Sequence, residues 1–157
     1  MEDADIFKFS SLTRTLLVLA YCHRFTNNAN PNATSIEGAL RTSELSMAVI
    51  YCIRIVQSQY YNKEISSLTA DESLPAKSSL HPLHPFLHED GTLRVGGRLE
   101  NSQLPFNAKH QFIIPVSHHF AMLITNDAHL KTLHVGVQLT MVKVRENFWI
   151  PALKRKV

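Results

Sequence analysis

The chain has 157 residues, of which 45% are hydrophobic and 18% charged, and its formal net charge is +3. This composition supports a folded core and excludes an intrinsically disordered protein. The longest apolar run, residues 16–22, is too short to span a bilayer, and the acidic residues 1–5 lack the positive charge that starts a signal peptide. We therefore expect an intracellular protein without a membrane partner.

Two amphipathic helices are expected in the first half of the chain. The first is capped by Ser10 or Ser11 and ends near Thr26, with leucines at helical spacing. The second is capped by Thr42 or Ser43 and lasts to about Tyr60, and it has the clearest periodic apolar stripe in the chain. Joined by a polar loop, the two helices predict an antiparallel helical hairpin.

Three further features of this half are expected. Residues 62–65 add a short helix, and residues 69–85, which contain three prolines and several serines, are a linker candidate. Cys22 and Cys52 lie in apolar helical patterns and are predicted to be buried free thiols, with a disulfide between facing helices as the alternative.

The periodicity then changes from helix to strand. Residues 86–88 and 92–95 flank an Asp90–Gly91 turn and predict a β-hairpin, and residues 111–114 predict a third strand. The fold class is therefore α+β and mainly α: a helical hairpin, a small strand element and further helices. We divide the chain into a helical region, residues 1–75, and a second region, residues 76–157.

Two helices are expected near the C-terminus. Ser117 is the predicted cap of a helix that ends near Leu133. After Gly136 a further helix is expected to carry apolar residues on one side as far as Phe148, and Pro151 ends it.

His129 and His134 are the candidate metal ligands. They lie at a helix end and just past it, so both imidazoles can face one point, which is half of a tetrahedral zinc site. The other half is normally a Cys-x-x-Cys pair, which does not occur before Val157. The alternative is a pair of surface histidines near a helix C-terminus, where the partial negative charge tolerates a cation.

The remaining histidines point less clearly to a metal. His81, His84 and His88 are close in sequence, but prolines extend the backbone between them, so their rings need not converge. The side chains of His118–His119 diverge at a helix start. The acidic residues are scattered, and no arrangement of nucleophile and base is present, so no enzyme active site is expected.

Basic residues gather at the C-terminal end of the chain. They favour an acidic partner such as nucleic acid, and a solvated helix face explains them equally well. The residues are Lys143, Arg145, Lys154, Arg155 and Lys156.

Several of these segments together resemble the polyprotein of BEL/Pao-type retrotransposons, in the stretch that joins ribonuclease H to the integrase. The resemblance covers essentially the whole chain, and the order of its motifs makes it specific. The segments are residues 17–25, 85–99, 109–115, 118–119, 129–136 and 148–151.

The resemblance implies a function in DNA integration. His129 and His134 match the two histidines of the family's His-His-Cys-Cys zinc site, in a small helical domain that supports integrase assembly and contact with element DNA. Strand transfer belongs to a separate ribonuclease-H-like core further downstream. Three departures matter: the cysteine pair is missing, the catalytic core is missing, and His88 stands where the family commonly has an acidic residue.

The sequence therefore predicts a fragment, or a degenerate copy, of a retrotransposon integrase region. It would be non-catalytic alone and carry a zinc half-site. Its expected partners are DNA, weakly bound, and further integrase or polyprotein chains, and its location would be nuclear in an active integrase. The alternative is a host-used protein-interaction module in which the histidine pair is vestigial.

Overall fold

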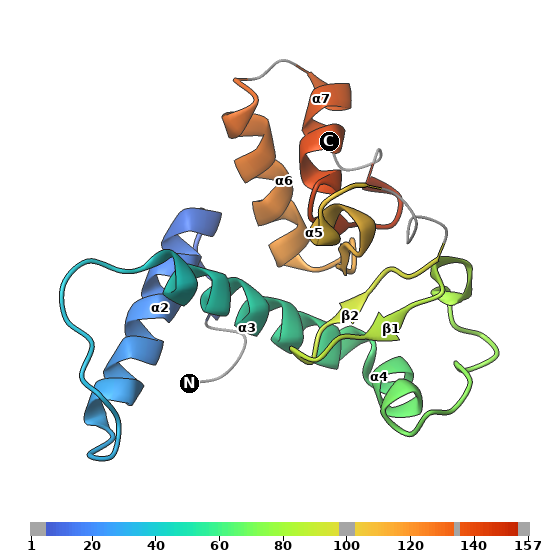
Figure 1. Ribbon diagram of the computed structural model, residues 1–157. Helices are drawn as coiled ribbons and strands as arrows, with labels where there is room; N and C mark the ends of the chain where they lie inside the picture. Colours follow the sequence, from blue (N-terminus) through green and yellow to red (C-terminus); the bar gives the residue numbers. More distant parts are fainter. Residues whose placement is uncertain (1–5, 98–102, 134–135, 154–157) are drawn as a thin grey trace. The chain divides into compact units, whose positions relative to one another are not determined.

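The computed structural model describes residues 6–97, 103–133 and 136–153, and it has a mainly helical α+β fold (Figure 1). The predicted fold class is confirmed. By internal contacts the chain divides into two compact units, Met1–Cys52 and Ile53–Val157, with the boundary inside helix α3 (Thr42–Tyr60). The division near residue 75 made from sequence stays a prediction. None of the helices described is long and apolar enough to span a membrane.

The predicted helical hairpin is present, and the first unit contains its first helix and the beginning of α3. Helix α2 (Leu12–Ala29) begins after Ser11, whose side-chain oxygen accepts a hydrogen bond from the Arg14 N–H at 3.4 Å. This oxygen satisfies one of the N–H groups that a helix start leaves without an intrahelical acceptor. The start of α2 agrees with the prediction, but helix α3 already includes Thr42 and Ser43, so the cap predicted at one of these two residues is placed too far along the chain.

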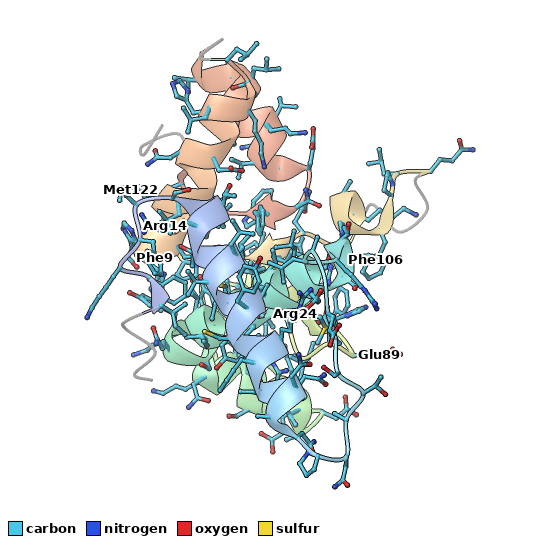
Figure 2. All side chains as sticks on the ribbon, turned by 90° about the vertical axis from the view of Figure 1, so that its left-hand side faces the viewer. Phe9, Arg14, Arg24, Glu89, Phe106 and Met122 are labelled. Carbon is cyan, nitrogen blue, oxygen red and sulfur yellow. The ribbon has the colours of Figure 1, made fainter. Side chains whose placement is uncertain are left out.

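An ion pair fixes the loop between α2 and α3. Arg24, which is labelled in Figure 2, donates to both carboxylate oxygens of Glu44, at 2.8 and 2.6 Å. It also donates to the Gly38 carbonyl oxygen at 2.6 Å. Glu44 also accepts from the Arg41 N–H at 2.8 Å, one turn before it. The hydrogen bond from Arg24 is the main reason that the pKa of Glu44 falls to about 2. The same carboxylate therefore caps α3 and holds α2.

The two cysteines differ in environment. Both are free thiols; Cys52 is buried and burial raises its pKa to about 12, whereas Cys22 is exposed. The prediction of a buried Cys22 is wrong because the outward face of α2 is also apolar, so hydrophobic spacing did not identify the buried face.

The second unit is built on a small mixed sheet. Its strands follow the order β1-β2-β3-β4; β1–β2 and β2–β3 are antiparallel, and β3–β4 is parallel. The elements are α4 (Asn62–Thr69), a 3-10 turn (His81–Leu83), β1 (Phe86–Leu87), β2 (Leu93–Arg94), α5 (Phe106–Lys109), β3 (Phe112–Ile113), α6 (His119–Lys131), α7 (Val137–Arg145) and β4 (Phe148–Trp149).

The hairpin β1–β2 forms around the expected turn. The His88 N–H donates to the Thr92 carbonyl oxygen at 2.9 Å, and the Gly91 N–H donates to the His88 carbonyl oxygen at 2.8 Å. Gly91 has φ +74°, a conformation that glycine adopts without steric cost. The predicted third strand is confirmed as β3.

The core of the sheet includes part of the segment predicted as a linker. Leu80 is 1% exposed and packs with Leu93 and Ile113. The linker prediction for residues 69–85 is therefore wrong at its C-terminal end. Prolines shape the turns there, but the one buried leucine fixes the segment to the sheet.

Gln57 of α3 joins two strands. Its side chain is fully buried; Oε1 accepts from the Leu93 N–H at 2.7 Å, and Nε2 donates to the carbonyl oxygens of Leu93 at 2.8 Å and Ile113 at 2.9 Å. The amide lies between the Leu93 N–H and the Ile113 C=O and bonds to both. It thereby takes the place of a direct bond between β2 and β3.

Two predicted boundaries near the C-terminus are wrong. The cap of α6 is His118, whose Nδ1 accepts from the Phe120 N–H at 3.0 Å, and not Ser117. Helix α7 ends at Arg145, and Phe148–Trp149 form β4, paired with β3, instead of continuing the helix.

Candidate functional site

Helices α6 and α7 form the hairpin that carries the candidate metal ligand. The inner face of α6 is apolar, with Phe120, Leu123 and Ile124 buried, and α7 contributes Met141 and Val144. Because both faces are apolar, burying them against each other stabilises the antiparallel pair. Residues 134 and 135, which follow α6 in the sequence, lie outside the described residues.

His129 lies in the last turn of α6 on the side of α7. Its ring is half-buried, and Nδ1 lies 3.4 Å from Oγ1 of Thr140. Thr140 is fully buried, and its hydroxyl donates to the Gly136 carbonyl oxygen at 3.1 Å. The imidazole is therefore held between the two helices. His134, the second predicted ligand, lies outside the described residues.

A zinc ion would find one suitable ligand here. A structural site needs four nitrogen, sulfur or oxygen donors in a tetrahedron. Over residues 6–97, 103–133 and 136–153, no group of three or more His, Cys, Asp or Glu side chains could hold a metal ion. His129 fits the role of one ligand, and a complete site would need His134 and donors from outside the described residues.

The other histidines have separate partners. His81 Nε2 lies 2.9 Å from the Pro75 carbonyl oxygen, and His88 Nδ1 lies 3.1 Å from Oδ1 of Asp90. His118 is the cap of α6, and burial, followed by the neighbouring charge of His119, lowers its pKa. It is therefore held as a neutral hydrogen-bond acceptor for the helix start.

A buried arginine connects the hairpin β1–β2 with α5. Arg94 is 4% exposed and donates to Asp90 Oδ2 at 2.8 Å and to Asn107 Oδ1 at 3.0 Å, and its guanidinium lies 3.9 Å from the centre of the Phe112 ring. Burial raises the pKa of Asp90, but hydrogen bonds from Thr92 and Arg94 outweigh it and lower this pKa to about 2. The ion pair between Arg94 and Asp90 therefore has a structural role: Arg94 is paired with Asp90 and also bonds to Asn107 of α5.

The basic residues predicted to contact nucleic acid are only partly described. Lys143 is exposed and pairs with Glu146 at 2.7 Å, and the guanidinium of Arg145 lies 5.9 Å from the centre of the Trp149 ring. An exposed pair of this kind is weak and can open toward a phosphate. Lys154, Arg155 and Lys156 lie outside the described residues.

Thr140 is the site residue that sequence reasoning missed. Its place on α7, three residues after Val137 and one before Met141, puts a hydroxyl on the buried face of an amphipathic helix. A buried hydroxyl needs a partner, and this requirement could have identified it as a neighbour of a predicted ligand.

A comparison of the chain with protein-family models, curated proteins and solved structures finds no significant match.

Proposed function

We propose that this chain carries half of the zinc site of an integrase-type module from a BEL/Pao-like retroelement, which supports DNA integration without catalysing it. The observation that supports the proposal is the position of His129. It lies in the last turn of α6, half-buried on the side of α7, five residues before His134. We expect such a module to be intracellular, and nuclear within an active integrase.

Zinc binding tests this proposal directly. Two imidazoles leave half of the coordination sphere to water, so most of the roughly 10 to 16 kcal/mol of a complete structural site should be absent. Calorimetry on the whole chain should therefore show weak binding that His129→Ala abolishes. His84→Asn is the matched control, because His84 is exposed with φ +43°, which asparagine tolerates. Binding that is absent in the wild type, or that survives His129→Ala, contradicts the proposal.

The same proposal predicts weak DNA binding by the basic C-terminal end. Binding should be tolerant of DNA sequence, with a dissociation constant on the order of 10⁻⁴ to 10⁻⁶ M at physiological salt. The logarithm of the binding constant should fall with the logarithm of the salt concentration, with a slope of about −0.9 per contacted phosphate. Fluorescence anisotropy over a salt series should show that Lys143→Ala with Arg145→Ala weakens binding and reduces the slope. The matched double variant, Lys63→Ala with Lys77→Ala, should leave both unchanged. No binding at low salt refutes this part.

The second candidate function is a protein-interaction module in the helical half. The observation that favours it is an exposed apolar stripe on α2: Leu17, Tyr21 and Phe25 follow at four-residue spacing and are 38, 54 and 73% exposed. Exposed apolar residues that form a stripe commonly mark a binding surface. Zinc and DNA binding separate the two candidates, because only the integrase-type module predicts either.

A further inference from the structure

We propose that Thr140 is a positioning residue that holds His129 in the tautomer with its proton on Nδ1. Nε2 is then the nitrogen that would bind a metal. The first statement concerns the imidazole alone, and the second rests on the zinc-binding function proposed above.

The hydrogen bonds of the Thr140 hydroxyl carry this inference. Oγ1 lies 3.1 Å from the Gly136 carbonyl oxygen and 3.4 Å from Nδ1 of His129. A carbonyl oxygen only accepts, and a hydroxyl has a single proton to donate. When that proton points to Gly136, a lone pair of Oγ1 faces His129, and both contacts are hydrogen bonds if Nδ1 carries a proton.

With the opposite tautomer of His129, the Thr140 hydroxyl makes fewer hydrogen bonds. If Nδ1 carried the lone pair, the Thr140 hydroxyl would have to turn to His129 and give up its bond to Gly136, so one contact would be made instead of two. Thr140 is fully buried, so water cannot compensate for the bond that is lost. The contacts of the Thr140 hydroxyl therefore favour the arrangement with the proton on Nδ1.

A fixed tautomer prepares the ring for a metal. A neutral imidazole has one N–H and one lone pair, so a proton on Nδ1 leaves the lone pair on Nε2. Metal-binding histidines almost always donate their second ring N–H to a neighbouring acceptor, which fixes the tautomer and the orientation of the ring. The Thr140 hydroxyl has the geometry of such an acceptor. Thr140 belongs to α7, whereas His129 belongs to α6.

The ring nitrogens of His129 test the inference without any metal. In a long-range ¹H–¹⁵N spectrum of the ¹⁵N-labelled whole chain at pH 8, His129 should show a protonated Nδ1 and an unprotonated Nε2. The His129→Asn variant assigns the signals. Thr140→Val removes the hydroxyl at constant volume and should move the proton toward Nε2, whereas Thr140→Ser should restore the wild-type pattern. A wild-type His129 with its proton on Nε2, or a pattern unchanged by Thr140→Val, overturns the inference.

A zinc titration of the same samples then separates the two proposals. Thr140→Val should lower zinc affinity by about 10- to 100-fold, and Thr140→Ser should stay near the wild type. If the wild-type tautomer is as expected but no zinc binds, the positioning role stands and the proposed function fails. If zinc binds through His129 and the tautomer is the opposite one, the positioning role fails and the proposed function stands.

Discussion

Replacing Gln57 by leucine removes the amide that joins β2 and β3 while keeping a side chain of similar size. Three hydrogen bonds disappear, and each contributes about 0.5 to 1.5 kcal/mol to stability. The Leu93 N–H and the Ile113 C=O lose this partner in a buried environment, which adds to the loss. We expect the free energy of unfolding to fall by about 3 kcal/mol, a large part of the roughly 5 to 15 kcal/mol of an ordinary domain.

Urea unfolding at neutral pH, followed by far-ultraviolet circular dichroism, measures this loss. The matched control is Gln59→Leu, two residues further along α3 on an exposed position, which should change stability by less than about 0.5 kcal/mol. Hydrogen exchange of the Leu93 amide should also accelerate in Gln57→Leu. If Gln57→Leu is as stable as the control, the amide is not a structural bridge between the strands and the reasoning is refuted.

Three other expectations concern the same fold. Gly96→Ala should lower the free energy of unfolding in urea by about 2 to 4 kcal/mol, because its Cβ would clash with the backbone carbonyl oxygen of His84. Gly38→Ala, with open space but φ +86°, should lower it by about 1 kcal/mol; equal losses contradict the steric account. Asp90 has a pKa of about 2, below its ordinary 3.8, so its contribution of about 1 to 2 kcal/mol is complete above about pH 4 and is lost as the pH falls toward 2. Asp90→Asn should remove that part of the acid sensitivity, and an unchanged acid unfolding profile would rule the contribution out. A thiol-alkylating reagent should modify the exposed Cys22 in the native protein and the buried Cys52 only after unfolding; mass spectrometry that finds both modified together refutes this difference.

Local signals predicted local structure well. The cap at Ser11, the stripe of α3 and the Asp90–Gly91 turn each depend on residues close in sequence, and each was located to within one or two residues. The signals failed where distant partners decide. Phe148 continues the helical spacing of α7, yet pairing with β3 makes it a strand residue. The periodicity of apolar residues alone does not distinguish pairing with a distant strand from a further turn of the helix.

In the candidate site, too, the sequence predicted the local feature and missed the contact between residues distant in sequence. The sequence predicted that His129 lies at a helix end, and the structure confirms this position in the last turn of α6. Its contact with Thr140, eleven residues further along the chain, depends on how α6 packs on α7. Whether His134 completes a zinc half-site stays a prediction.

The parallel pairing of β3 and β4 has a consequence for shortened forms of the protein. Two parallel neighbours need a long crossover, and here that crossover is the segment containing α6 and α7. A chain that stops before Phe148 could still form both helices, but Phe112 and Ile113 would lose the ladder on one side. Such an apolar open edge recruits strands from other molecules. Truncation upstream of Phe148 should therefore produce aggregates, which light scattering would detect, and not a smaller version of the same fold.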